Sequence, residues 1–285
     1  MYDNLHISEV NFTPLTEVKI VTLTGPDAAA FCHAQFASDV ATLSLGHWQW
    51  STWLTPKGRV IAIFLLAHVD EQQVMLVLPD GDADAIAAQL RRFVFRRKVR
   101  IEARDDLTAA GHMNPPPVGG SLIGVEAERR LFDLGAAGVA RTLGVLPTTT
   151  KPMIAPAFAH LWRQFDLRMG LPRLDASQRE QWTPQQIGLD RLNAYSVKKG
   201  CYPGQEIVAR THFLGKAKRS TRLLELVTAA QPGDAVQQGE QIIGRVVSVA
   251  SGLALAVLPL ESELDGLTVA GAPVRLSTLL DGLAR

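Results

Sequence analysis

The sequence has few cysteines and no long apolar run. Only two cysteines, Cys32 and Cys201, occur among 285 residues, and they lie in unrelated settings 169 positions apart (201 − 32), so a disulfide framework is excluded. No stretch of about 18 or more apolar residues occurs, and the first residues lack a basic segment followed by an apolar one, so neither a membrane-spanning helix nor a secretory signal is expected. We therefore expect a cytoplasmic protein, because reducing conditions suit unpaired thiols.

The sequence also lacks an excess of positive or of negative charge. The 29 Lys and Arg residues nearly balance the 28 Asp and Glu residues, which gives a formal net charge of +1. Such a chain has no overall field that would attract nucleic acid or an anionic membrane, so an anionic partner must be held by a local basic cluster. The composition, with 47% hydrophobic and 20% charged residues, predicts a soluble globular protein that can bury large hydrophobic cores.

Patterns that bind metals are absent too. The seven histidines show no HxH or HExxH spacing, and neither cysteine belongs to a CxxC pair. Two thiols cannot supply the usual four ligands of an iron–sulfur cluster. We expect no metal site and no cluster held permanently by this chain alone.

The hydrophobic periodicity predicts mixed α and β structure. The expected elements are a strand over 17–25, a helix over 26–43, an antiparallel meander over 48–79, a helix over 80–98, a strand over 99–103, an exposed connection over 111–121 and a helix over 158–170. Beyond Gly215 the pattern changes to short β-type runs punctuated by Gly and Pro. These runs indicate a small β-barrel or sandwich at the end of the chain.

Cys201 lies in a short loop within KKGCYPGQEIVAR, residues 198–210. Two glycines bracket it, and glycine permits positive φ and close backbone approach, so the loop can form a tight cradle. The residues after the loop are typical of a helix start, which would place the thiol just before a helix N-terminus and beside two lysines, a setting that favours the thiolate. From the residues alone, a purely structural role is as well supported as a functional one. In that interpretation Cys201 is a small buried hydrophobic residue and Tyr202 is a packed aromatic. The residues Lys199, Gln205, Glu206 and Arg210 are then ordinary loop or helix residues.

The stretch from Lys199 to Glu206, followed by Ala209 and Arg210, resembles the signature of YgfZ-type folate-binding proteins. These proteins are related to the aminomethyltransferase (T-protein) of the glycine cleavage system. Three further segments resemble the family in the expected order: LTGPDAAAFCHAQFASDV (23–40), LTPKGRVIA (54–62) and TPQQIGLDRL (183–192). One helix departs from the family pattern, because Cys32, His33 and Ala34 stand where relatives carry Leu-Gln-Gly. Since Cys32 takes the Leu position, we expect it in the core.

The resemblance implies an α+β fold, a three-part ring around a central hole that binds a reduced folate, with a C-terminal β-barrel. The expected domains are a discontinuous folate-binding domain of 1–46 plus 106–213, an inserted domain of 47–105 and a barrel domain of 214–285. The signature loop would line the hole, with Cys201 as the reactive group facing a tetrahydrofolate. The residues expected to contact the folate are Lys199, Gly200, Tyr202, Gly204, Gln205, Glu206 and Arg210.

The function that the resemblance implies is that of an accessory factor. It would hold tetrahydrofolate and use Cys201 in maturing or repairing iron–sulfur enzymes, and thereby affect the modification of some tRNAs. Its partners would be a reduced folate and iron–sulfur client proteins or assembly factors. A non-catalytic binding scaffold and a folate-dependent one-carbon transferase are the alternatives. The transferase needs a positioned acid or base; Asp80, Asp82 and Asp84 lie in a suitable region, but their spacing also suits helix capping.

Two basic clusters are candidates for an anionic partner. The first consists of Arg91, Arg92, Arg96, Arg97, Lys98 and Arg100, and the second of Arg210, Lys216, Lys218, Arg219 and Arg222. No RNA-binding motif or interleaved aromatic residues accompany them, so we expect direct tRNA binding to be weak at most. The turn from Thr55 to Arg59 is interpreted as a hairpin tip, although Lys57 or Arg59 could meet an anionic folate tail.

Overall fold

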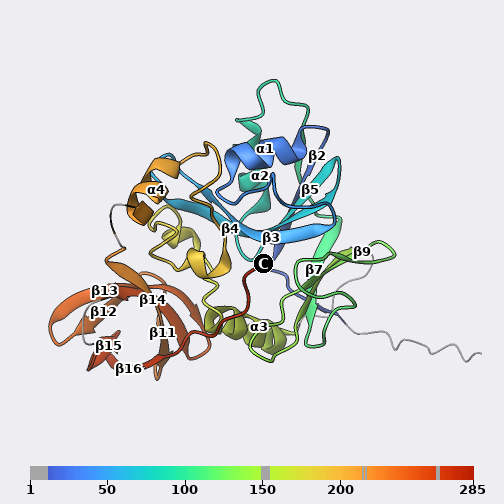
Figure 1. Ribbon diagram of the computed structural model, residues 1–285. Coiled ribbons are helices and arrows are strands. Elements are labelled where there is room, and N and C mark those ends of the chain that lie inside the picture. The colour runs from blue at the N-terminus through green and yellow to red at the C-terminus, as the bar shows by residue number, and fades with distance from the viewer. Residues whose placement is uncertain (1–11, 149–154, 214, 216, 261–263) are drawn as a thin grey trace, which may run out of the picture.

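The computed structural model describes residues 12–148, 155–213, 215, 217–260 and 264–285. Two five-stranded sheets and a closed barrel surround the point where the described chain ends (Figure 1). This arrangement confirms the predicted α+β fold with a C-terminal barrel. Among the described residues, no helix combines the length and the apolar character that crossing a membrane requires.

Sheet 1 carries the predicted meander and is antiparallel throughout, in the order β3-β4-β5-β2-β6. Its strands are β3 (His47–Leu54), β4 (Val60–Asp70), β5 (Gln73–Leu78), β2 (Lys19–Thr24) and β6 (Arg100–Ala103). The predicted domain boundary at residue 46 does not coincide with a boundary of this sheet. The strand Lys19–Thr24, expected in the discontinuous domain, pairs on both sides with strands of the expected insert.

Two helices cover one face of sheet 1 and are shorter than predicted. They are α1 (Ala28–Gln35) and α2 (Ala83–Arg91), and both contribute to one apolar cluster with the sheet. Helix α1 stops early because Phe36 adopts an extended conformation and forms a β-bridge with Trp53. After α2 the chain cannot continue as a helix, because Phe95 has a φ of 48°.

Sheet 2 and helix α3 form the second part of the ring. The strands of sheet 2, in spatial order, are β1 (Thr13–Pro14), β7 (Leu107–His112), β10 (Thr142–Pro147), β9 (Arg129–Asp133) and β8 (Gly124–Glu126). Helix α3 (Pro156–Arg168) confirms the predicted helix and ends before Gly170, whose φ is 72°. It packs against β7 through Trp162, whose ring lies against Gly111, and it contacts the barrel on its other side.

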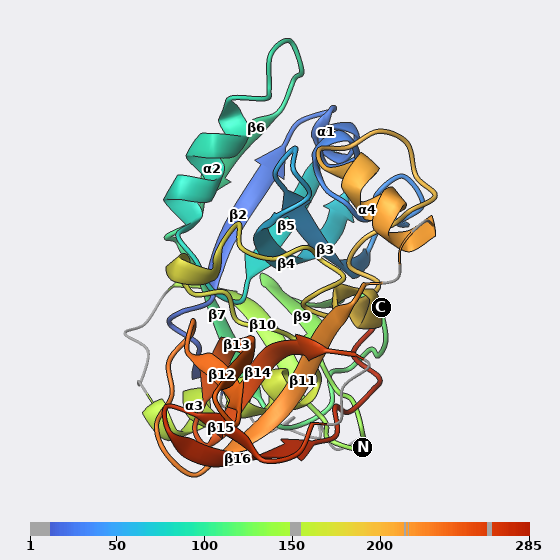
Figure 2. The same ribbon diagram turned by 90° about the vertical axis from the view of Figure 1, so that its left-hand side faces the viewer.

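The barrel confirms the expectation for the last part of the chain. Its strands, in spatial order, are β11 (Arg219–Leu226), β14 (Leu253–Pro259), β13 (Gln241–Ala250), β12 (Ala235–Gln238), β15 (Leu267–Val269) and β16 (Ala272–Ser277). Short 3₁₀ turns at Ala176–Gln178 (η1) and Leu189–Leu192 (η2) and the helix α4 (Gln205–Phe213) connect sheet 2 to the barrel. In Figure 2, α4 and α2 lie on opposite sides of sheet 1.

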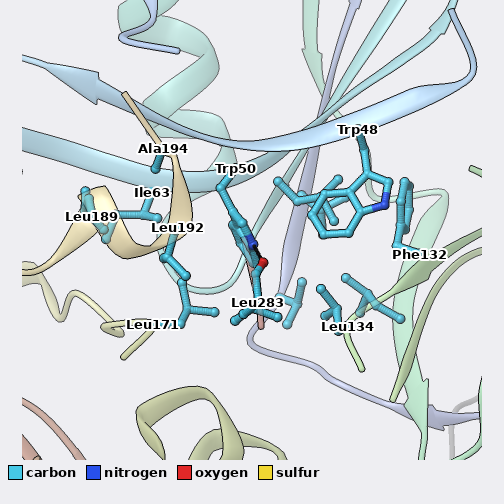
Figure 3. Packing of buried hydrophobic residues seen from close by; sticks show 14 of the residues in the cluster. Trp48, Trp50, Ile63, Phe132, Leu134, Leu171, Leu189, Leu192, Ala194 and Leu283 are labelled. Carbon is cyan, nitrogen blue, oxygen red and sulfur yellow. Dashed lines mark hydrogen bonds between the residues drawn. The ribbon is translucent and has the colours of Figure 1, made fainter. Parts of the chain in front are cut away.

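The largest apolar cluster lies where the parts of the ring meet. Trp48 and Trp50 of β3 project into it from sheet 1, and Phe132 reaches it from sheet 2 (Figure 3). The segment after β16 enters the same cluster: Leu283 is 2% exposed, and its carbonyl accepts a hydrogen bond from Trp50 Nε1 at 2.9 Å. The centre of the ring is therefore filled by the protein's own side chains.

Candidate functional site

The signature loop, residues 199–204, packs against the end of α1 and against the turn between β3 and β4 of sheet 1, and it leads into α4. Helix α4 begins at Gln205, as the sequence predicted, and the loop from Lys199 to Gly204 leads directly into it. Tyr202 is buried in the central cluster, and its hydroxyl donates to Ser196 O at 2.9 Å. Gln205 Nε2 donates to Lys199 O at 3.2 Å. Tyr202 and Gln205 thus hold the loop in place.

Lys199 is turned into the protein. Its Nζ donates to the carbonyls of Phe36 (2.6 Å), Ser38 (3.0 Å) and His33, at and just beyond the end of α1. An ammonium group has three donors, so these contacts use all of them. Burial lowers the pKa of Lys199 to about 8, and the three carbonyls offset part of the cost of burying the charge. Lys199 therefore caps α1, and it has no donor left for a ligand.

The two glycines of the signature differ in what surrounds them. Gly204 has a φ of +82°, and a Cβ there would lie 2.6 Å from Thr55 O and 2.8 Å from the Cα of Gly58. At Gly200 a Cβ would meet nothing within 4 Å. The turn Thr55–Arg59 thus packs backbone against backbone on the signature loop, which explains glycine at 204 and leaves glycine at 200 without a steric reason.

We predict that Gly204→Ala lowers the free energy of unfolding by about 2 kcal/mol, because it combines left-handed backbone strain with a backbone clash. Gly200→Ala is the matched control, and it should change this free energy by less than about 0.5 kcal/mol. Urea unfolding followed by circular dichroism measures both. Equal losses in the two variants would contradict the assigned packing.

The remaining predicted site residues face outward. Cys201, Glu206 and Arg210 are exposed, and they do not converge on Lys199. Cys32, in contrast, is fully buried in α1, and burial raises the pKa of its thiol strongly. The prediction that Cys32 is a core residue is confirmed, and Cys201 is the thiol that solvent reaches.

A buried group of charges near the ring centre was not predicted from the sequence. Asp166 of α3 accepts from Arg141 Nη1 at 2.9 Å and from Arg173 Nη1 at 2.8 Å, and all three side chains are less than one-tenth exposed. One signal was available: Asp166 follows Trp162 by four positions and therefore lies on the buried face of its helix. The partners Arg141 and Arg173 are distant in the sequence and gave no local signal.

The three candidate carboxylates have different roles. Asp82 caps α2, because its Oδ1 accepts from Ala85 N at 3.1 Å. Asp84 is exposed in the first turn of α2. Asp80 lies 3.3 Å from Arg173 Nε and accepts from Leu174 N at 3.1 Å. Burial raises the pKa of Asp80 to about 6, and the nearby guanidinium of Arg173 opposes this rise only in part.

The raised pKa of Asp80 predicts a pH dependence of stability. Between about pH 4 and pH 6 the unfolded chain has lost this proton while the folded protein still holds it. The free energy of unfolding should therefore fall as pH rises through this window, by at most about 3 kcal/mol. Asp80→Asn should remove this slope, while Asp84→Asn should keep it. Urea unfolding at about pH 4.5 and pH 7 tests this, and identical slopes in the wild type and Asp80→Asn would refute it.

The ring centre is closed in this structure. The cavity beside Trp50, Trp162, Asp166 and Arg173 measures about 20 Å³, which is room for about one water molecule. The predicted open hole lined by the signature loop is therefore not observed. The segment that closes it is held by polar contacts as well: Arg285 Nη2 donates to the carbonyls of Asp133 and Gly135 at 3.0 and 2.9 Å, and Arg191 Nη2 donates to Leu280 O at 2.8 Å.

Comparisons with known proteins agree with this architecture. No protein-family model matches the chain. The tRNA-modifying protein YgfZ of Photobacterium profundum is 26% identical over 92% of this chain and 88% of its own length, and that of Vibrio vulnificus strain YJ016 is 28% identical over 79% and 72%. The crystal structure of glycine cleavage system aminomethyltransferase T from Bartonella henselae superposes with a TM-score of 0.73 at 18% identity, covering 95% of this chain and 85% of that one.

Proposed function

Because the chain is related to the YgfZ proteins and has the fold of aminomethyltransferase T, we propose that it is a folate-binding accessory protein. In this proposal it binds a reduced folate and supports tRNA modification by assisting the assembly or repair of iron–sulfur enzymes. Cys201 is the reactive group, and the client enzymes or assembly factors are its protein partners.

The observation that carries this proposal is the exposure of Cys201 on a loop whose neighbouring residues are held by hydrogen bonds and packing. The neighbouring residues Lys199, Tyr202 and Gln205 direct their polar groups inward, and Gly204 packs against a backbone turn. Cys201 is exposed between these anchors, and it precedes the N-terminus of α4. A thiol held in this way can react with a large partner without a change in the fold, which suits a group that acts on another protein.

We place the folate at the ring centre, among Trp50, Trp162 and the charges around Asp166. Two buried donors of the surrounding core, Trp48 Nε1 and Arg141 Nη2, have no hydrogen-bond partner among the described residues. They do not line the small cavity itself, so they can bind carbonyl or carboxylate oxygens of a ligand only once the centre has opened. These residues fit a folate, which carries both kinds of oxygen. Pockets for ligands of this size measure about 300–1,000 Å³, so the segment 280–285 has to leave before the folate enters.

This placement predicts that loosening the segment improves folate binding. Calorimetry with tetrahydrofolate or folinic acid should detect binding to the unaltered chain. Leu283→Ala should tighten it several-fold, because it weakens the packing that competes with the ligand. Leu276→Ala, at an exposed leucine of β16, is the control and should leave the affinity unchanged. If neither folate gives a heat of binding with the unaltered chain or with either variant, and all three proteins are folded, the proposed function is overturned.

The one-carbon transferase receives no support from the candidate carboxylates. Asp82 is used as a helix cap, and Asp80 is engaged by Arg173 and by Leu174 N. Asp84 is exposed on α2. The accessory function needs none of these groups, so we prefer it.

A further inference from the structure

A second cavity lies outside the ring centre, beside α4. It has a volume of about 620 Å³, and four separate segments supply its walls, three of which carry cationic side chains. Arg59 comes from the turn between β3 and β4, Arg210 from α4, and Lys218 and Arg219 from the start of β11. The second basic cluster identified from the sequence contained Arg210, Lys218 and Arg219 but not Arg59. The fold adds Arg59 to them, about 150 residues away along the chain (210 − 59 = 151).

The charge of this cavity is uncompensated. Its lining contains four cationic side chains and, among the described residues, no Asp or Glu. Arg210 and Lys218 make no side-chain hydrogen bond or ion pair within the described part of the chain. Since the whole protein has a net charge of only +1, four positive charges around one cavity are a strong local concentration, and they repel one another unless an anion is bound.

Two of the four cations that line the cavity are anchored by backbone carbonyls. Arg59 Nη1 is fixed by Gln181 O at 2.8 Å, and Arg219 Nη1 by Ile243 O at 2.5 Å. Each guanidinium keeps further N–H donors for a ligand. Such fixed guanidinium groups lose little conformational entropy when they bind an oxyanion, which is the arrangement that phosphate recognition uses.

We propose that this cavity, lined by Arg59, Arg210, Lys218 and Arg219, binds the phosphodiester backbone of RNA. No aromatic side chain lines it among the described residues, so bases have no stacking platform and recognition falls to the phosphates. The walls include the polar residues Thr183, Gln186 and Thr211. The inference rests on the proposed role in tRNA modification, and it gives that role a physical contact with the RNA.

The expected binding is weak and sensitive to salt. Contacts to four phosphates give a slope of about −3 in a plot of log affinity against log salt, which is a loss of about 60-fold between 50 and 200 mM salt. Fluorescence anisotropy with labelled tRNA and with a short single-stranded RNA measures this slope. Inorganic phosphate and ATP serve as competitors that distinguish a small-phosphate site from an RNA site.

The decisive comparison uses two matched double charge reversals. Lys218→Glu with Arg219→Glu should weaken RNA binding at least about tenfold at 50 mM salt and reduce the slope by about 1.5. Arg96→Glu with Arg97→Glu changes the same charge in an exposed adjacent pair beyond α2, and it should change the affinity less than about twofold. Circular dichroism confirms that both variants are folded.

Equal losses in the two double variants, absence of RNA binding at about 50 mM salt, or full displacement of RNA by inorganic phosphate below about 1 mM would each overturn the RNA site. Calorimetry with tetrahydrofolate on the Lys218→Glu, Arg219→Glu variant distinguishes a failure of the proposed RNA site from a failure of the proposed folate-binding function. Folate binding should persist in that variant because the ring centre is a different site. If the protein binds RNA but no folate, in contrast, the RNA site is supported and the proposed folate-binding function is refuted.

Discussion

Cys201→Ser should abolish the biological function and leave the fold intact. Serine keeps nearly the same volume, but its hydroxyl is a far weaker nucleophile than a thiolate at neutral pH. Because Cys201 is exposed and its loop is held by its neighbours, the melting temperature should stay within a few degrees of wild type. The measurement is restoration of iron–sulfur enzyme activity and tRNA modification in a strain that lacks its own copy of such a protein. The variant should restore neither.

The second cysteine provides the control. Cys32→Ala should lower stability by about 1 kcal/mol, since it leaves a small cavity in the core, and it should still complement. Iodoacetamide should modify Cys201 well before Cys32, because Cys32 is fully buried and burial raises its pKa. Full complementation by Cys201→Ser would show that the thiol has no chemical role, and the chain would then act as a binding scaffold.

Lys199→Met should be the most destabilising change in the signature, with a loss of about 3–4 kcal/mol in the free energy of unfolding. The substitution keeps the aliphatic stem but leaves the carbonyls of His33, Phe36 and Ser38 without the donors that now satisfy them. Buried acceptors without a partner cost about 1–3 kcal/mol each when the structure cannot relax around them. Chemical unfolding measures the loss.

Lys198→Met is the matched control, because it removes the same charge from the adjacent, exposed position. It should change stability by less than about 0.5 kcal/mol. If Lys199→Met is as stable as Lys198→Met and loses only folate affinity, then Lys199 is a ligand as the family resemblance implied, and its role as a cap is wrong.

Local patterns predicted the parts of this fold that depend on neighbouring residues. The meander, the barrel and the start of α4 after a glycine-bracketed loop all follow from periodicity and turn chemistry. The lengths of α1 and α2 did not follow, because the helical pattern continues beyond Gln35 and Arg91. The end of α1 is set instead by a tertiary contact, the bridge between Phe36 and Trp53. Beyond α2 the positive φ of Phe95 prevents the helix from continuing.

The site was predicted only in part for the same reason. The residues around Cys201 left its exposure open, and only the family resemblance favoured a reactive thiol there; the structure places it at the surface. The burial of Cys32 was expected because it takes the Leu position of the family pattern. The use of Lys199 as a cap for α1 was not predicted, because its acceptors lie more than 160 residues earlier in the chain. The packing of Leu283 against Trp50 joins positions 233 residues apart, and no pattern within either segment indicates it.

The position of β2 in sheet 1 has a consequence for how the protein folds. β2 lies between β5 and β6, and it pairs Val21 with Ala103 across a chain separation of 82 residues (103 − 21). The chain must close this long loop before the sheet is complete, so the sheet forms late and slowly compared with the local β3-β4-β5 meander. Until then β5 presents an unpaired edge that can add a strand from another chain. Residues 47–105 expressed alone would keep that edge permanently, and they should therefore aggregate where the whole chain folds.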